Sequence, residues 1–229
     1  MHFHVITLFP ESFDSYLKES IIGRAIKEKK IKVSFVNPRK FVTGKKYKKV
    51  WPDGNVSQIV DDRPFGGGPG MVIRAEPVLK AVESVVKKVS KKKGAKIKII
   101  HFAPKGTMFT TEYAKDVMKK KYTDIVFLSG RYEGIDARVK TILKAEDVSI
   151  GDYVLTGGEL PAMVLIDSIS RQIPGVLGKF ESLEEERISS SDFYRRPEIL
   201  EWKGKKHRVP AVLLSGDHKK IDEWKQGKK

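Results

Sequence analysis

Three segments that follow predicted strands combine glycine with polar residues, which is a composition suited to binding a ligand. They are His101–Gly106, Ser129–Gly134 and Ser149–Leu155. In an open parallel sheet, ligands bind at the carboxyl ends of the strands, and glycine there lets the backbone approach a ligand closely. Ordinary turns also account for most glycines after strands, so spacing alone leaves a binding site and simple turn geometry as alternatives.

A fourth segment, Asp61–Met71, is unusual because four glycines and two prolines fall within its last eight residues. Such a loop has a specified backbone, and its small residues allow close contact with a flat partner such as a base. A flexible linker is the alternative. Linkers seldom carry the acidic, arginine and aromatic residues that surround these glycines, so we favour a binding loop.

Several common chemistries have no motif in this sequence. We find no G-x-G-x-x-G after a strand and no G-x-x-x-x-G-K-[ST], so a dehydrogenase, kinase or NTPase is not indicated. The chain has no cysteine, which excludes disulfides, cysteine-ligated zinc and a thiolate nucleophile. The histidines lack helical metal-ligand spacing, and we expect no metal site; they are His2, His4, His101, His207 and His218.

The chain is strongly basic, with 45 Lys and Arg against 29 Asp and Glu among 229 residues, for a formal charge of +16. Lysines cluster at Lys45–Lys49, at Lys87–Lys98 and after Trp202. Such a surface attracts polyanions by counterion release, and blocks favour an extended anionic partner over a small ligand. A lysine-rich, merely solvated surface is the alternative.

The N-terminal apolar run is too short and too mixed for a signal peptide, and it lacks a basic start. No stretch reaches the roughly 18 apolar residues that a membrane helix needs. We therefore expect a soluble, cytoplasmic protein without a membrane partner.

Hydrophobic periodicity predicts alternating strands and helices around these turns. Strands are expected at 2–8, 31–36, 96–102, 125–128 and 148–150, helices at 11–29, 76–89, 112–120, 135–143, 160–173 and 217–225, and a long loop at 38–75. The alternation predicts an α/β fold with a mostly parallel sheet and helices on both faces. The irregular, charged stretch 174–197 predicts a linker between a domain at 1–173 and a segment at 198–229.

Taken together, the motifs resemble the signatures of the bacterial tRNA (guanine-N1)-methyltransferase family. The match runs in order over nearly the whole chain: Asp61–Met71, Gly130–Asp136, Ser149–Met163, Arg171 with Ile173–Gly178, Arg196–Glu198 and Val212–His218. Agreement of this length is not expected by chance.

The resemblance implies a trefoil-knotted α/β domain of the SPOUT type and a homodimer whose active site is shared across subunits. It implies S-adenosylmethionine as the cofactor and tRNA, not DNA, as the partner, with methylation at N1 of the guanosine that follows the anticodon. By the same resemblance, the cofactor-binding residues are Pro104, Gly106, Gly130, Ile150, Gly151, Asp152, Tyr153, Val154, Leu155, Gly157 and Gly158.

The chemistry of that reaction needs two protein groups. Guanine N1 carries a proton at neutral pH, so a carboxylate within hydrogen-bond reach can serve as general base. A cation near O6 stabilises the charge that develops there, and arginine stays charged throughout. Arg171 matches the family's arginine in this role. Because the methyl donor is itself the electrophile, neither a protein nucleophile nor a metal is required.

The general base is where the chain departs from the family, whose aspartate lies in a loop of the form Leu-Asp-x-Pro-x-Tyr-Thr-Arg-Pro. The corresponding segment is Ile188–Pro197, and ungapped alignment puts Ser190 at the aspartate position. A serine hydroxyl is too weak a base, so we assign the catalytic role to Asp192, which a gap before Tyr194 brings into place.

Two further departures leave alternatives open. Ala103 and Lys105 stand where the family more often has serine and glutamine, and the family usually continues into a longer helical C-terminal domain that grips tRNA. We expect a reduced C-terminal helical segment here. The alternatives to an active tRNA enzyme are a knotted dimer that binds cofactor or RNA with degenerate catalysis, and a related SPOUT enzyme acting on another RNA.

Overall fold

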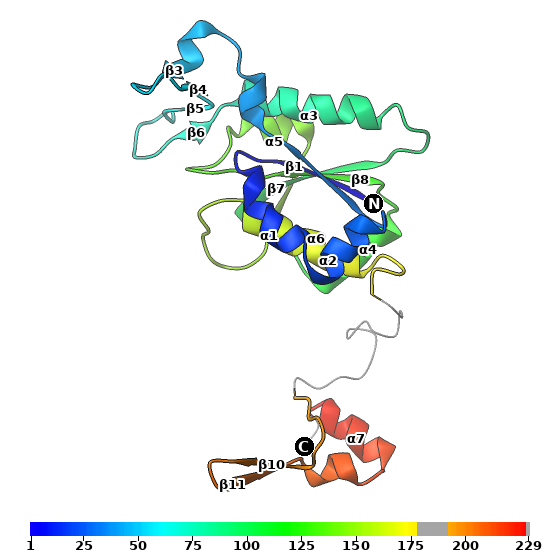
Figure 1. Cartoon of the computed structure of the whole chain (residues 1–229). Helices are drawn as coiled ribbons and strands as arrows, with labels where there is room; N and C mark the ends of the chain where they lie inside the picture. Colours follow the sequence, from blue (N-terminus) through cyan, green and yellow to red (C-terminus); the bar gives the residue numbers. More distant parts are fainter. Residues whose placement is uncertain (178–191, 228–229) are drawn as a thin grey trace. The chain divides into compact units, whose positions relative to one another are not determined.

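The computed structural model describes residues 1–177 and 192–227, and the chain divides into two compact units, Met1–Val176 and Leu177–Lys229 (Figure 1). This division lies within the predicted linker 174–197, most of which falls outside the described residues. Each unit is described by itself below.

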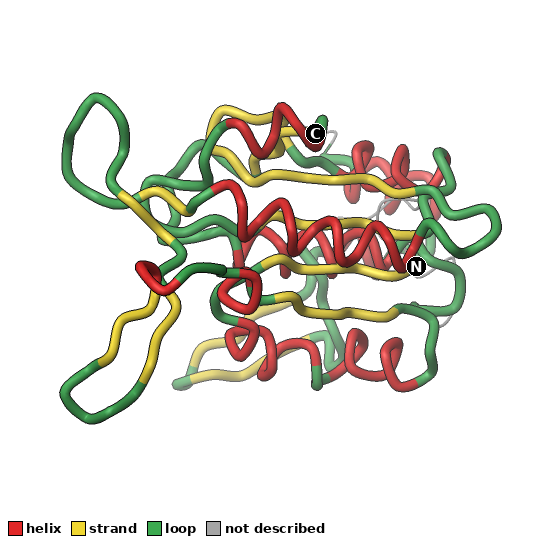
Figure 2. The backbone as a smooth tube through the Cα atoms, turned by 90° about the horizontal axis from the view of Figure 1, so that it is seen from above, coloured by secondary structure: helices red, strands yellow, loops and turns green. Residues whose placement is uncertain are grey.

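The first unit is built on a five-stranded sheet in the order β2-β1-β8-β7-β9, in which every strand pairing is parallel. Figure 2 shows these strands side by side. The strands are β1 (His2–Ile6), β2 (Lys32–Val36), β7 (Ile97–Met108), β8 (Asp124–Leu128) and β9 (Glu146–Ser149). Because all five strands run in one direction, their carboxyl ends meet at one edge of the sheet.

Helices cover both faces of this sheet (Figure 1). Helices α3 (Ala75–Val89) and α5 (Arg138–Leu143) pack on one face, and α1 (Asp14–Leu17), α2 (Ser20–Lys27), α4 (Thr111–Lys119) and α6 (Glu159–Arg171) pack on the other. Each face has its own apolar core, which explains the near-continuous hydrophobic composition of the central strands. The predicted mostly parallel α/β fold is confirmed.

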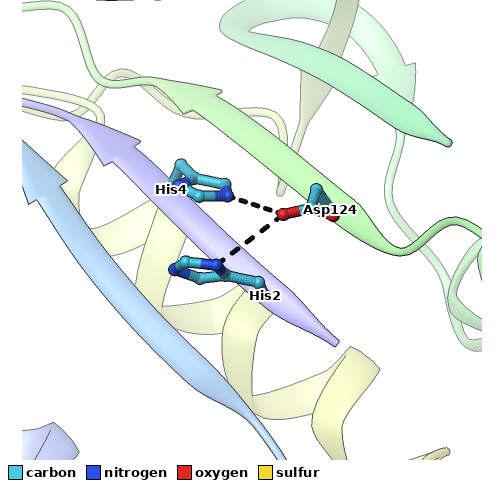
Figure 3. Close-up of side chains that lie close together, drawn as sticks. All are labelled: His2, His4 and Asp124. Atoms are coloured by element: carbon cyan, nitrogen blue, oxygen red, sulfur yellow. Dashed lines mark hydrogen bonds and ion pairs between the residues drawn. The ribbon is translucent and has the colours of Figure 1, made fainter. Parts of the chain in front are cut away.

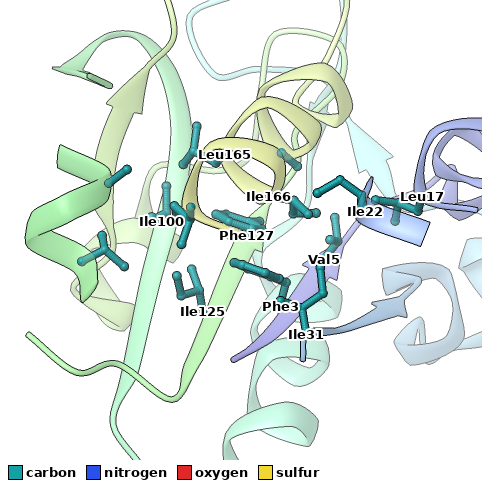
Figure 4. Close-up of a cluster of buried hydrophobic side chains, with 14 of the residues drawn as sticks. Phe3, Val5, Leu17, Ile22, Ile31, Ile100, Ile125, Phe127, Leu165 and Ile166 are labelled. Carbon is teal, nitrogen blue, oxygen red and sulfur yellow. The ribbon is translucent and has the colours of Figure 1, made fainter. Parts of the chain in front are cut away.

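The centre of the core is β8, in which every residue is buried. Phe127 stacks against Phe3 at 5.9 Å and against Phe102 at 5.5 Å between ring centroids, and Ile125 and Leu165 belong to the same cluster (Figure 4). This packing fixes β8 between β1 and β7, and therefore fixes the chain that emerges after Leu128.

The sequence predicted one helix over 11–29, but the structure breaks it into a 3-10 turn, η1 (Pro10–Phe13), followed by α1 and α2. Leu17 and Ile22 are both buried, yet on one continuous helix residues five apart would point about 140° away from each other. The helix break at Ser20, whose φ is +51°, lets both side chains reach the core.

The predicted loop 38–75 contains short ordered elements instead. They are the 3-10 turns η2 (Pro38–Phe41) and η3 (Lys45–Tyr47) and two antiparallel hairpins, β3 (Lys48–Val50) with β4 (Val56–Gln58) and β5 (Asp61–Asp62) with β6 (Val72–Ile73). The hairpins extend from one end of the sheet (Figure 2). The turn between β3 and β4 contains Asp53-Gly54, with Gly54 at φ +81°; this pair is a turn signal that the prediction of a plain loop did not use.

The second unit contains the hairpin β10 (Ile199–Trp202) and β11 (Lys205–Arg208), a 3-10 turn η6 (Ala211–Leu214) and helix α7 (His218–Lys225). The Asp217 side chain caps α7 by accepting hydrogen bonds from the amides of Lys219 and Lys220, which confirms the predicted last helix. The hairpin was missed because its turn, Lys203-Gly204, has positive φ at both residues without the usual Asn or Asp.

Among the described residues, no helix combines the length and apolar character needed to cross a membrane.

Replacing Phe127 by alanine should lower the free energy of unfolding by about 3–5 kcal/mol, because the cavity left among tightly packed rings cannot collapse. The control is Phe65→Ala, the same change at a side chain that is fully exposed, which should stay within about 0.5 kcal/mol of the parent. Urea denaturation of both variants measures the difference. Equal losses would contradict the assignment of β8 as the centre of the core.

Candidate functional site

A cavity of about 340 Å³ opens at the carboxyl ends of β7, β8 and β9. Its walls come from the three strand-end segments that the sequence singled out. The lining residues are His101 to Pro104, Gly130 to Ile135, Val148 to Gly151, Tyr153 to Gly158, and Pro161.

Most of the residues assigned to cofactor binding lie together in this wall: Pro104, Gly130, Ile150, Gly151, Tyr153, Val154, Leu155, Gly157 and Gly158. Gly106 and Asp152 do not line the cavity. A Cβ on Gly106 would lie 2.5 Å from the backbone of Asp147 and Val148, so this glycine lets β7 pass close to β9. Asp152 is exposed.

An irregularity in β7 brings Pro104 to the cavity. Phe102 and Thr107 both pair in register with Val148 of β9, so the residues between them leave the ladder. The extra residues loop outward at the carboxyl end of β9. The sequence predicted only a strand that stopped at Phe102, because the alternation of apolar residues ends there.

The loops after β8 and β9 pass against each other at their backbones. The Gly158 amide donates to the Gly130 carbonyl at 2.9 Å, the Ser129 hydroxyl donates to the Gly158 carbonyl at 3.1 Å, and Arg131 forms an isolated antiparallel bridge with Gly157. A Cβ on Gly158 would lie 2.6 Å from the Cα of Ser129. Only glycine permits this approach, so the shape of the cavity depends on it.

A buried carboxylate fastens the same two loops. Glu159, the first residue of α6, is only 3% exposed, and its Oε2 lies 2.9 Å from Nε of Arg131. Its Oε1 accepts a 2.7 Å hydrogen bond from the Thr7 hydroxyl, just beyond β1. The Arg131 guanidinium also lies over the Phe9 ring, 4.8 Å from its centroid. We call this set of four residues the Glu159 clamp.

The glycine-rich segment docks on the loop after β8. The Glu133 amide donates to the Met71 carbonyl, and the Ile73 amide donates to the Gly134 carbonyl. A Cβ on Gly70 would lie 2.5 Å from the Glu133 carboxylate, and Gly70 has φ +91°. The exposed tip at Phe65 therefore projects from a base that is anchored next to the cavity.

Beside the cavity, His101 and Lys140 converge on the carboxylate of Asp147. Partial burial acts to raise the pKa of Asp147, but hydrogen bonds from Lys140 and His101 outweigh it and hold that pKa below its usual value. Asp147 therefore stays ionised near neutral pH and orients the imidazole that lines the cavity.

The two residues assigned to catalysis lie in different units. Arg171 is the half-buried last residue of α6. Asp192 is exposed in the second unit, in a stretch without helix or strand. Ser190, the alternative position for the base, lies outside the described residues.

The family model described as tRNA (Guanine-1)-methyltransferase TrmD matches residues 1–229. The chain belongs to this family. It is 44% identical to a tRNA (guanine-N(1)-)-methyltransferase of Clostridioides difficile, over 99% of this chain and 91% of that protein. It is 40% identical to its counterpart in Pseudoalteromonas atlantica, over 97% of this chain and 78% of the other.

A solved structure, the tRNA (m1G37) methyltransferase of Aquifex aeolicus, is similar with a TM-score of 0.72 and 35% identity, covering 98% of this chain and 87% of that one. The family resemblance drawn from the sequence signatures is thus confirmed.

The Glu159 clamp was missed by the sequence analysis, although Glu159 ends the Thr156-Gly-Gly-Glu run of the third signature. No sequence signal connects it to Thr7, 152 positions away.

Glu159→Gln should lower the free energy of unfolding by about 1–3 kcal/mol, because it removes the charge that Arg131 faces while keeping the shape. Amide hydrogen exchange should accelerate in residues 130–134 and 150–158. The matched control is Glu112→Gln on α4, whose carboxylate is 81% exposed and pairs with Lys115. If exchange in the two loops is unchanged, the clamp does not hold them together.

Proposed function

We propose that this protein transfers a methyl group from S-adenosylmethionine to N1 of the guanosine that follows the anticodon in tRNA. The observation that carries the proposal is that the family's glycine-bearing signatures converge on one cavity at the carboxyl ends of β7, β8 and β9. The names of the relatives state the same reaction class, and that of the solved structure states the position.

The cavity fits such a cofactor in size and in the nature of its wall. Its volume of about 340 Å³ lies within the roughly 300–1,000 Å³ of small-molecule sites. Phe102, Ile135 and Leu155 offer apolar surface for a purine, and the peptide groups of Gly130 and 150–155 offer donors and acceptors for its polar edges. When bound, S-adenosylmethionine supplies an electrophilic methyl group on a sulfonium sulfur.

The protein's own groups then act on the guanine. Asp192 accepts the proton from N1, which makes the nitrogen nucleophilic. Arg171 stabilises the negative charge that develops on O6, because its guanidinium stays charged and presents several donors. Neither role needs a protein nucleophile.

We further propose a homodimer in which one copy contributes Asp192 to the cavity of the other, with the cofactor bound in the family's trefoil knot. Exposed apolar side chains near the cavity support a second copy of the chain that covers this surface. Leu160 and Val164 are 54% and 43% exposed and share one face of α6, and Val154 in the cavity wall is 83% exposed.

Basic and aromatic side chains on exposed hairpins support tRNA as the substrate. Lys49 lies over the Trp51 ring at 3.8 Å on the β3–β4 hairpin, and the exposed Trp202 lies next to the lysines of the β10–β11 hairpin. Cations that contact phosphates and rings that stack on bases are the usual means of binding single-stranded RNA. With tRNA as its substrate, we propose that the protein acts in the cytoplasm.

Gly130→Val should weaken S-adenosylmethionine binding by roughly tenfold or more, equal to about 1.4 kcal/mol. A Cβ on Gly130 already meets Ile135 Cγ1 at 3.3 Å, so the branched side chain must crowd the cavity. Calorimetric titration measures the affinity. The control is Val154→Ala, which changes the wall without moving its backbone and should be mild. Equal effects of the two changes would contradict recognition through the backbone.

Asp192→Ala should slow single-turnover methylation by roughly 10²–10⁴-fold with unchanged cofactor affinity. The assay uses labelled S-adenosylmethionine and a tRNA transcript with guanosine after the anticodon, followed by mapping of the modified base. Asp222→Ala, at a half-buried aspartate of the same unit, is the control and should react at the parent rate. Near-parent rates for Asp192→Ala would refute its role, and a parent protein that binds cofactor but leaves tRNA unmethylated would refute the proposed function.

A further inference from the structure

Three side chains with metal-binding atoms converge at the opposite edge of the sheet, where β1 and β8 begin. His2 and His4 lie on β1, two residues apart, so their side chains leave the same face. Asp124, the first residue of β8, pairs in register with His2. Figure 3 shows both imidazoles turned toward the Asp124 carboxylate.

The distances between the donor atoms suit a single small cation. His4 Nε2 lies 2.9 Å and His2 Nδ1 lies 3.7 Å from Asp124 Oδ1, and the ligand atoms of all three residues lie within 4.8 Å of one another. Ligands held at the bond lengths of tetrahedral zinc, roughly 2.0–2.2 Å, lie about 3.3–3.6 Å apart. The two nitrogen-to-oxygen distances lie on either side of that value, so these two pairs reach coordination geometry with shifts of a few tenths of an ångström.

The orientation of His2 is fixed by a second contact. Its Nε2 lies 2.7 Å from the Ser34 hydroxyl on β2, which leaves Nδ1 directed at Asp124. Metal-binding histidines usually have such an outer partner on the second ring nitrogen, because it sets the tautomer and the ring position. The side chains of His2, His4 and Asp124 are only 16%, 8% and 2% exposed, so the donors are already held in place.

Contrary to the expectation from the sequence, we propose that His2, His4 and Asp124 form a binding site for a divalent metal ion of intermediate hardness, represented by Zn²⁺, that ties β1 to β8. Two imidazole nitrogens and one carboxylate oxygen favour such an ion over Mg²⁺ or Ca²⁺, which prefer oxygen ligands. A fourth position remains for water. The site lies at the amino ends of the strands, whereas the cavity lies at their carboxyl ends, so its effect is on stability rather than on chemistry.

One cation of the protein competes for the same oxygen. Lys92 Nζ lies 3.4 Å from Asp124 Oδ1, and its side chain is 56% exposed, so it can leave toward solvent. Binding of the ion must displace this contact. Removing the Lys92 ammonium should therefore tighten binding of the ion while leaving all three ligands in place. Nonspecific binding to surface histidines would not respond to this change.

The test is calorimetric titration of the full-length, tag-free protein with Zn²⁺, repeated with Co²⁺ to read the coordination from its absorption. We expect one ion per chain, a loss of affinity of at least roughly tenfold in His2→Ala and in Asp124→Asn, and tighter binding in Lys92→Ala. Zn²⁺ should raise the thermal midpoint of the parent and of Lys92→Ala, but not of His2→Ala. His207→Ala and His218→Ala, both on exposed histidines of the second unit, are matched controls and should bind like the parent.

Binding that survives in His2→Ala, or that is lost in either control variant, would overturn the proposal. So would absence of binding in both the parent and Lys92→Ala, which keeps all three ligands and tests the site even if Asp124→Asn does not fold. Equal affinity for Mg²⁺ would contradict the assigned class of ion.

Discussion

The site depends on the close passage of two backbones. The loop after β8 and the loop that leads into α6 meet at Gly130 and Gly158, where the amide of one donates to the carbonyl of the other. Because a Cβ on Gly158 would lie 2.6 Å from the Cα of Ser129, no larger residue fits without moving a loop. The cavity is the space that this contact leaves beside β7.

The core and the Glu159 clamp hold that contact in place. The fully buried β8 delivers Gly130 at a fixed point, and α6 begins at Glu159, directly after Gly158. The carboxylate of Glu159 then joins Arg131 to Thr7 from the first strand. These contacts hold the two loops that line the cavity, and a preorganised wall loses little entropy when it binds a ligand.

The sequence predicted the cavity better than the groups that support it. Glycines at strand ends such as Gly130 and Gly151 are local signals, and alternating strands and helices predicted the edge of the sheet where they meet. Gly106 shows the limit of this reasoning, because a glycine needed for ligand contact and one needed for strand contact have the same signature. Two contacts join residues more than 100 positions apart, Glu159 with Thr7 and His2 with Asp124. Only the folded topology brings these residues together. The helix break at Ser20 was missed because the residues around it can also continue a helix. The Lys203-Gly204 turn was missed because it lacks the usual Asn or Asp.

The central claim is that the backbone of the loops after β8 and β9 binds S-adenosylmethionine in the cavity. Amide hydrogen exchange with and without S-adenosylmethionine tests this claim most directly, because it reports on backbone groups. The account predicts slower exchange at residues 130–135 and 150–158 when the cofactor is present, and no change in the β3–β4 hairpin at residues 48–58. Saturation with cofactor that leaves the two loops unaffected, or protects another region instead, would contradict it.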